Sequence, residues 1–370
     1  MGKNIVILII ILLVTSCARE NEYTLKVFNY IDRSADSVEE KILVEFIKDK
    51  MMDEKGGIYT NLSDSSNISE LPSGQEILSE SIGLYMLYLS TSSSKDDFDH
   101  YFRYLNNQFV RNGVVSWRIK DSELYSSTGA VIDDLRIVKS LFIANDKWND
   151  EMYINLIEKI SDILLKKAIN QGMLVNDYGE NGSSSSIINL SYLDLYSLKR
   201  LEKINSKWKE VFKNAVDIIE KGRINKTGKF YYMYYDVVSK KYYGDGRNIS
   251  VLDSFLVDLH LSEIGILDKD KLDWFNKVKD TDIYSIYDIH VEKYSSDIES
   301  TSIYSVLVRI LKLNAVNDIS VLEEKIKSFQ IVEGQYSGGF GNENEMEFYS
   351  FDNLNALLYF VAKGGGKNEK

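Results

Sequence analysis

The side chains of this chain that could do chemistry are mostly carboxylates. The histidines, His100, His260 and His290, are far apart, and none has the spacing of an HExxH zinc motif. The single cysteine, Cys17, lies near the N-terminus, and the sequence contains neither a P-loop nor a G-x-S-x-G motif. We therefore expect no metal and no cofactor, and we expect carboxylates to act as general acids and bases.

Glu80 is the first candidate acid. It opens a strongly apolar segment, just after a loop that contains Pro72 and Gly74. A glutamate at a helix start also has a purely structural interpretation, because its negative charge interacts favourably with the helix dipole. Since that position favours the ionised form, a proton-donating Glu80 needs apolar burial or a neighbouring carboxylate to keep its proton.

The elements that must position these side chains are helices. Apolar residues recur at i, i+3, i+4 and i+7 beyond residue 36, and the single proline, Pro72, leaves long helices uninterrupted. This periodicity predicts about twelve helices, at residues 38–52, 77–92, 96–110, 131–145, 150–169, 187–202, 206–222, 250–264, 269–279, 298–313, 318–330 and 350–363.

A glycine followed by apolar and aromatic residues recurs between alternate helices. These glycines are Gly57, Gly113, Gly172, Gly228 and Gly334, and the first four are 56, 59 and 56 residues apart. A repeat of this length, with two helices in each unit, predicts an all-α (α/α)6 toroid with short strand–turn elements at one end. The alternative is an open α-solenoid, which would need capping repeats. In a toroid, functional residues are expected in the loops around the mouth.

Four segments of the chain, taken in order, carry a family resemblance. Ser79–Met86 (SESIGLYM) resembles S-E-G-x-G-Y-G-M, and Asn112–Arg118 (NGVVSWR) resembles D-G-L-L-A-W-R. Ala130–Ile137 (AVIDDLRI) is similar to A-T-D-A-D-L-D-I-A, and Ile188–Leu193 (INLSYL) is similar to N-P-S-Y-F. These are motifs of glycoside hydrolase family 8, and the chain looks most like a lipoprotein branch of that family associated with exopolysaccharide hydrolysis.

The resemblance implies roles for individual residues. Glu80 matches the general acid of the family, and Asp134, or its neighbour Asp133, matches the central carboxylate that orients the sugar. Trp117 would stack on a sugar ring, and Tyr192 is a weaker candidate of the same kind. The structural alternatives are acids that stabilise a helix start and an aromatic ring packed in the core.

Two further tyrosines are candidates for sugar binding. Tyr85 lies in the first matching segment, and Tyr232 lies in an aromatic run that extends from Phe230 to Tyr243. If this run is a strand, alternate rings could equally belong to the core.

The family places its general base in Y-D-x-x-R-x-P at the start of a late helix, and the positional match is Leu252–Asp258. Asp253 is present there, but the tyrosine, the arginine and the proline are replaced. The missing arginine removes a charge that could hold the base ionised. We expect Asp253 to be the base, with Asp245 as the alternative.

Together these residues predict an inverting, endo-acting glycoside hydrolase of a β-linked polysaccharide or exopolysaccharide. In such an enzyme the acid and the base stand about 6.5–9.5 Å apart, which leaves room for the attacking water. One alternative is a non-catalytic glycan-binding lipoprotein on the same toroid, suggested by the altered motif around Asp253. A polysaccharide lyase is a further alternative, which the acidic charge and the few histidines disfavour.

The N-terminal residues predict where the protein acts. Lys3 precedes an apolar run, Ile5–Val14, which has the length of a signal-peptide core. Residues 1–16 then end before Cys17 in a pattern that resembles a bacterial lipobox. We expect a lipid on Cys17 to anchor the protein to the cell membrane on its extracytoplasmic side. An ordinary signal peptide followed by an incidental cysteine is the alternative.

The rest of the chain is predicted to contain a tether at residues 17–36, a catalytic domain at residues 37–363 and a disordered tail at residues 364–370. The net charge of −12 at pH 7 argues against a nucleic acid partner, because the phosphate backbone would be repelled. A polysaccharide is the expected partner, and the protein is expected to be a monomer.

Overall fold

The computed structural model describes residues 23–26, 37–63, 74–92, 94–120, 124–224, 228–244 and 247–364 of the chain. The predicted signal peptide, Cys17 and Asp245 lie outside the described residues. Within the described part of the chain, none of the helices combines the length and the apolar character that crossing a membrane requires.

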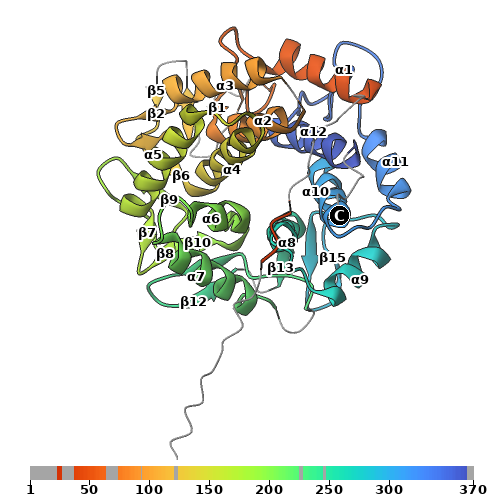
Figure 1. The fold of residues 1–370 in the computed structure, drawn as a ribbon. Coiled ribbons are helices and arrows are strands. Elements are labelled where there is room, and N and C mark those ends of the chain that lie inside the picture. Colours follow the sequence, from red (N-terminus) through yellow and green to blue (C-terminus); the bar gives the residue numbers. More distant parts are fainter. Residues whose placement is uncertain are drawn as a thin grey trace, which may run out of the picture.

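Two concentric rings of helices make up the described part of the protein (Figure 1). The inner ring contains α2 (Ser79–Ser92), α4 (Val131–Trp148), α6 (Leu195–Leu201), α8 (Val251–Glu263), α10 (Thr301–Leu313) and α12 (Ser350–Gly364). The outer ring contains α1 (Val38–Phe46), which a π-helical turn (Ile47–Met51) extends, α3 (Lys95–Gln108), α5 (Glu151–Lys167), α7 (Trp208–Lys221), α9 (Lys269–Val278) and α11 (Ser320–Ser328). Each inner helix contacts the next, and α12 contacts α2, so the inner ring is closed. This closure confirms the predicted (α/α)6 toroid.

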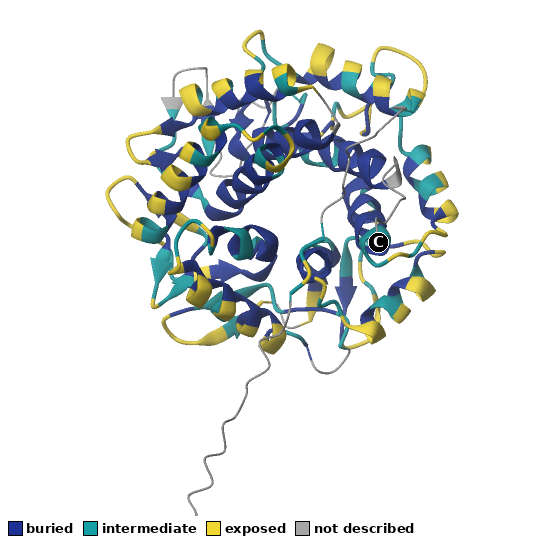
Figure 2. Cartoon of the chain, viewed as in Figure 1, coloured by how far each residue is buried: buried dark blue, intermediate teal, exposed yellow. Residues whose placement is uncertain are grey.

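The hydrophobic core lies between the two rings. Each outer helix buries large side chains completely, among them Phe98 of α3, Tyr153 of α5, Trp208 of α7 and Phe275 of α9. Figure 2 shows the inner ring almost entirely buried, whereas the outer helices expose the side that faces away from it. Because one helix pair cannot bury such a stripe alone, the pairs stabilise one another around the ring.

Short antiparallel strands lie in the connections between the helices. Three sheets have three strands each: β1 (Ile77–Leu78), β4 (Arg118–Lys120) and β5 (Leu124–Tyr125); β10 (Ile187–Asn189), β11 (Tyr234–Asp236) and β12 (Lys241–Tyr243); β13 (Asn248–Ser250), β14 (Ile286–Asp288) and β15 (Lys293–Tyr294). Three pairs complete the set: β2 (Val110–Arg111) with β3 (Val114–Val115), β6 (Thr128–Ala130) with β9 (Asp177–Gly179), and β7 (Ile169–Asn170) with β8 (Met173–Leu174).

Two of the recurring glycines sit in the turns of strand hairpins. Gly113 joins β2 to β3 and Gly172 joins β7 to β8, with φ values of 72° and 77°. This left-handed conformation strains residues that have a side chain, which explains the glycines. The strands lie mainly in connections that lead from the end of an outer helix to the start of the next inner helix. The starts of the inner helices are therefore gathered at the strand-bearing end of the ring.

One predicted helix, at residues 187–202, is wrong in its first half. Strand β10 and a 3-10 turn (Leu190–Tyr192) precede a short α6. The Asn189 side chain accepts a hydrogen bond from the Ser191 N–H (3.0 Å), and Asp194 caps α6 by accepting from the Ser197 N–H (2.9 Å). Such side-chain bonds offer the backbone an alternative to the helix, which apolar periodicity does not reveal.

Four residues of the predicted tether, Tyr23 to Lys26, pack against the opposite end of the ring. The Lys26 N–H donates to the carbonyl of Glu263 (2.7 Å), and its Nζ donates to the carbonyl of Leu313 (3.4 Å). Glu263 and Leu313 are the last residues of α8 and α10. The Tyr23 ring meets Phe212 edge-on, with centroids 4.9 Å apart.

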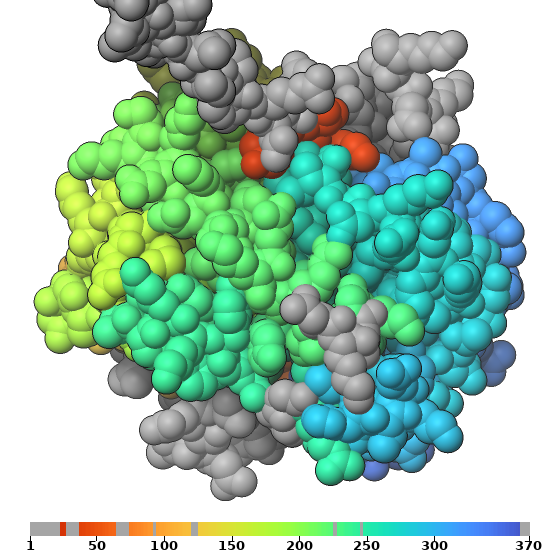
Figure 3. Space-filling view, turned by 90° about the horizontal axis from the view of Figure 1, so that it is seen from below, coloured from red at the N-terminus to blue at the C-terminus, as the bar shows by residue number. Residues whose placement is uncertain are grey.

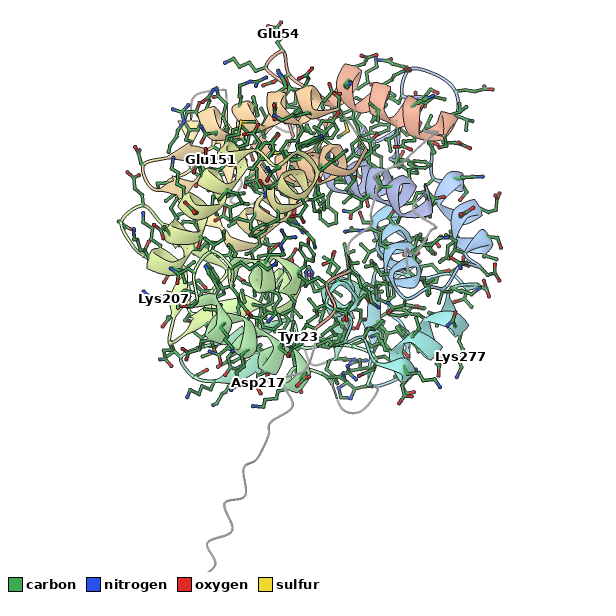
Figure 4. The ribbon with its side chains drawn as sticks, viewed as in Figure 1. Tyr23, Glu54, Glu151, Lys207, Asp217 and Lys277 are labelled. Atoms are coloured by element: carbon green, nitrogen blue, oxygen red, sulfur yellow. The ribbon has the colours of Figure 1, made fainter. Side chains whose placement is uncertain are left out.

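The figures place this segment at one end of the ring. Figure 3 shows it in red, between surfaces of the green and cyan parts of the chain. In Figure 4, Tyr23 is seen within the outline of the ring, whereas Glu54, Glu151 and Lys277 stand on the outer rim.

Candidate active site

The predicted acidic residues all lie in first turns of inner helices. Glu80 is in the first turn of α2, Asp133 and Asp134 are in that of α4, and Asp253 is in that of α8. Because these helices start at the strand-bearing end, the four carboxyl groups belong to the same end of the ring. In the order of the inner ring, α2 and α8 stand opposite each other.

Hydrogen bonds to the connecting segments fix where two of these helices begin. The Ser79 N–H donates to the carbonyl of Trp117 (3.0 Å), which ties the start of α2 to the segment that enters β4. The Ser250 hydroxyl accepts the Asp253 N–H (3.2 Å) and caps α8. This long-range contact brings the backbone of Trp117 to Ser79, the residue before Glu80, although the two are far apart in sequence.

Glu80 and Asp133 share one arginine. Nη1 of Arg136 is 2.9 Å from Oε2 of Glu80 and 3.4 Å from Oδ1 of Asp133. The Ser79 hydroxyl donates to Oδ2 of Asp133 (2.8 Å). The Glu80 side chain remains 27% exposed, against 6% for Asp133 and 10% for Arg136. Glu80 is thus the member of this group that solvent or a ligand can reach most easily.

Asp133 is electrostatically unusual. Burial and then the charge of Glu80 raise the pKa of Asp133 to about 7, against the opposing effects of Arg136 and the Ser79 hydrogen bond. A carboxyl that titrates near neutrality beside another carboxyl is typical of acid–base sites. This is the neighbouring carboxylate that the sequence argument required beside Glu80.

Asp134 points elsewhere than its neighbour. It is fully buried and accepts a hydrogen bond from the Tyr178 hydroxyl (2.5 Å). Burial raises the pKa of Asp134 well above its usual range, although the Tyr178 hydrogen bond acts against this. Oδ1 of Asp134 is buried and has no hydrogen-bond partner among the described residues. Of the two aspartates, Asp133 is the one that the structure brings to Glu80.

Asp253 is held by neutral groups. Its Oδ1 is 2.8 Å from the Ser191 hydroxyl, which is itself 2.8 Å from Oδ1 of Asn189. Asp253 also lines a cavity of ≈ 160 Å³, together with residues of β10, the 3-10 turn, the aromatic run and β14, among them Asn189, Ser191, Tyr232, Met233 and Ile286. The candidate base therefore faces an open space at the strand-bearing end.

Tyr192 connects the two sides of the site. Its pKa is raised to about 12 by burial and by the charge of Asp133, with smaller effects from Glu80 and Asp253 in the same direction and an opposing effect from Arg136. Such charge effects require short distances in a partly buried setting. The candidate acid Glu80 and the candidate base Asp253 therefore both lie close enough to Tyr192 to influence its pKa.

The other predicted aromatic residues separate into two groups. Trp117 is half-buried, with the Arg118 guanidinium 4.6 Å from its ring centroid. Tyr232 lines the cavity next to Asp253 and stacks on Tyr242. Tyr85, in contrast, is 1% exposed and packs edge-on against Tyr101 of α3, with centroids 4.8 Å apart. Tyr85 thus belongs to the packing between the rings and is out of reach of a ligand.

Sequence reasoning did not single out the residues that hold these carboxylates. Arg136, Ser79 and Ser191 all lie inside the motif segments, but serines are common at helix starts and an arginine on a helix gives no signal by itself. Of these residues, only Arg136 could have been noticed in the sequence, because the family pattern has an aspartate at that position. Phe351, whose ring centroid is 5.7 Å from the Arg136 guanidinium, gave no signal at all.

A second charged cluster lies deeper in the ring. Nζ of Lys139 is 3.0 Å from Asp194 and 2.5 Å from Glu263, and Nδ1 of His260 is 3.6 Å from Glu263. Asp194, His260 and Glu263 are the metal-compatible group found among the described residues. Because Lys139 already supplies a positive charge to both carboxylates, this cluster is a buried ion-pair network of the scaffold.

Comparisons with known proteins agree with this arrangement. A structure described as a novel alpha-amylase from Clostridium perfringens is 34% identical, has a TM-score of 0.82 and matches over 88% of this chain and 97% of its own. YdaJ of Bacillus subtilis (strain 168), which bears a lipoprotein name, is 28% identical over 85% of this chain and 84% of its own. Endoglucanase Cel10 from Klebsiella pneumoniae, a family 8 glycosyl hydrolase, has the same fold at 14% identity, with a TM-score of 0.63 over 88% of this chain and 99% of its own.

A closed double ring of helices with carboxylates at one mouth defines a class of glycoside hydrolases. Residues 34–301 match the profile of the family described as glycosyl hydrolases family 8. The chain belongs to this family and is an O-glycosyl hydrolase, which confirms the resemblance found in its motifs.

Proposed function

We propose that this protein is an inverting, endo-acting glycoside hydrolase in which Glu80 is the general acid and Asp253 is the general base. The observation that carries the proposal is that both carboxylates lie in first turns of opposite inner helices and both act on Tyr192. Two carboxylates on opposite sides of a bound sugar are what single displacement by water requires.

In the proposed reaction, Asp253 removes a proton from water while the water oxygen attacks the anomeric carbon. The bond from that carbon to the glycosidic oxygen breaks, and Glu80 gives its proton to the leaving oxygen. Asp253 ends protonated and Glu80 ionised, so both must exchange a proton with solvent before the next cycle. The exposure of Glu80 and the cavity beside Asp253 support such exchange.

Three aromatic residues are the proposed sugar contacts. The backbone of Trp117 contacts Ser79, the residue before Glu80, and Tyr232 lies beside Asp253. Tyr192, whose pKa responds to both carboxylates and to Asp133, would pack against the sugar at the cleavage point. Aromatic rings at these places could hold successive sugar units across the mouth of the ring.

Two relatives suggest two candidate substrates. The β-linked polysaccharide or exopolysaccharide predicted from the motifs is supported by the endoglucanase of the same family. An α-linked glucan is the second candidate, and the alpha-amylase structure favours it, since it has the higher identity and the closer superposition. Both substrates fit the same acid and base, because inversion requires only that water attack from the face opposite the leaving oxygen.

We also propose that the enzyme works outside the cell, anchored by a lipid on Cys17. The lipoprotein name of the Bacillus relative supports this location. The packing of Tyr23–Lys26 against the ends of α8 and α10 adds a geometric argument. An anchor attached next to this segment leaves the proposed active site, at the other end of the ring, facing away from the membrane.

Release of reducing ends from β-glucans, α-glucans and bacterial exopolysaccharides tests this function. Wild type is expected to cut at least one of them to products of inverted configuration, and Glu80→Gln is expected to lose activity by a factor on the order of 10³. Glu76→Gln is a matched control, because Glu76 lies close by in the sequence and pairs with Arg118 (3.4 Å) without contacting Asp133 in the described structure. Equal rates for wild type and Glu80→Gln would exclude Glu80 as the acid.

A further inference from the structure

The acid side of the site contains a cation that the proposed reaction does not use. Arg136 is 8% exposed, and its Nη1 contacts both Glu80 and Asp133. In the family pattern this position, two residues after Asp134, is an aspartate. An arginine in its place reverses the local charge beside the proposed acid.

This reversal raises a chemical difficulty. A guanidinium 2.9 Å from Glu80 stabilises the ionised carboxylate, whereas a general acid must carry a proton when the substrate binds. Asp133 supplies the opposite effect, because its negative charge repels ionised Glu80. The balance between these two neighbours decides when Glu80 is protonated.

We propose that Asp133 and Arg136 are positioning residues that set, by opposite charge effects, the pH range in which Glu80 holds its proton. This inference rests on the proposed role of Glu80 as the general acid. It gives Asp133 a function that the structure does not give to the fully buried Asp134.

The geometry holds this trio in a defined arrangement. Asp133 accepts from the Ser79 hydroxyl (2.8 Å), and the Arg136 guanidinium lies over the Phe351 ring at 5.7 Å. The other titratable groups that interact with Asp133 are Asp134 on the same helix, Tyr178 on β9 and Tyr192 before α6. Arg136 is the cation that forms ion pairs with both Glu80 and Asp133.

The titration of Asp133 agrees with this arrangement. Burial and the charge of Glu80 raise the pKa of Asp133 to about 7. Near neutral pH, Asp133 therefore gains or loses its proton beside Glu80 and opposite the guanidinium of Arg136. Removing the charge of Asp133 and removing the charge of Arg136 should therefore shift the proton equilibrium of Glu80 in opposite directions.

The test is the pH profile of kcat/KM for wild type, Asp133→Asn, Arg136→Gln and Arg136→Lys. The basic limb reports loss of the proton from the acid in the free enzyme. Asp133→Asn should move this limb to lower pH by about one unit, because ionised Glu80 loses a repelling neighbour. Arg136→Gln should move it to higher pH by a similar amount, and Arg136→Lys, which keeps the charge, should stay near wild type.

Arg200→Gln is the matched control. Arg200 pairs with Asp146 (2.6 Å) near the last turns of α6 and α4, at the opposite end of the ring, so its loss should leave the profile unchanged. The inference is wrong if the basic limbs of the Asp133→Asn and Arg136→Gln profiles both stay in place, or if both move in the same direction. If Asp133→Asn does not fold, the comparison of the pH profiles of Arg136→Gln and Arg136→Lys tests the inference by itself.

A second measurement does not depend on activity. Infrared difference spectroscopy of the wild type should show a carboxyl group that loses its proton near pH 7, and this signal should vanish in Asp133→Asn. If the signal is present but no glycan is cut, the proposed function fails while the electrostatic arrangement around Asp133 stands. A folded wild type that lacks the signal contradicts the inference itself.

Discussion

The proposed acid side and the proposed base side of the site are built in different ways. Glu80 lies in a charged group, with Arg136 at 2.9 Å and the buried Asp133 beside it. Asp253 is held by neutral groups, the hydroxyl of Ser191 and the cap from Ser250, and it opens into a cavity. The charged surroundings can shift a proton equilibrium strongly, whereas the neutral hydrogen bonds mainly fix a position.

This difference matches the two tasks of an inverting hydrolase. The acid must hold a proton near neutrality, so its surroundings have to counter the tendency of an exposed glutamate to ionise. The base must be ionised and correctly aimed at a water molecule, which hydrogen bonds from hydroxyl groups support. The comparison therefore predicts that changes on the acid side alter pH dependence, and that changes on the base side alter kcat at all pH values.

The largest expected effect is the loss of activity in variants of Glu80 and Asp253, and the leaving group of the substrate distinguishes the two variants. On a polysaccharide, Glu80→Gln and Asp253→Asn should each lower kcat by a factor on the order of 10³. On an aryl glycoside whose leaving group needs no proton, Glu80→Gln should regain most of its activity, while Asp253→Asn should not. Initial rates on the two substrate types measure this, and equal recovery of both variants would remove the distinction between acid and base.

A smaller effect is expected from Ser191→Ala. The hydroxyl lies 2.8 Å from Oδ1 of Asp253, and losing a hydrogen bond to a charged group costs about 1.5–3 kcal/mol. We expect kcat to fall about tenfold or more, with the limbs of the pH profile in place. Ser197→Ala is the control, since that buried hydroxyl donates to the Leu135 carbonyl (2.8 Å) and not to a carboxylate of the site. A wild-type kcat for Ser191→Ala would show that Asp253 is positioned by other contacts.

The smallest effects distinguish the two kinds of aromatic residue. Trp117→Ala should raise KM about fivefold, which corresponds to about 1 kcal/mol of lost stacking. Tyr85→Phe should leave kcat and KM within a factor of about two, because its ring is packed between α2 and α3 and the packing ring is kept. Steady-state kinetics on one polysaccharide compares them, and a large KM change for Tyr85→Phe would place this residue back in the site.

Much of the site could be predicted because it depends on local sequence. Apolar periodicity placed Glu80, Asp133, Asp134 and Asp253 at starts of helices, and the structure has them there. It could not decide between Asp133 and Asp134, since adjacent residues on a helix point about 100° apart and only the neighbouring helices fix their directions. Tyr85 was misplaced for the same reason: its spacing allows either the inner face or the face toward α3.

The sequence by itself determined the helices, their pairing into six repeats and the family, because periodicity and short motifs are properties of contiguous residues. Only the tertiary structure decided that Arg136 lies between Glu80 and Asp133, and that Ser191 holds Asp253 across 62 residues of chain. These contacts join residues from different inner helices and connections, and closure of the ring brings them together. The proton equilibria of the site are set by such contacts, because charge effects depend on distance in space and on burial.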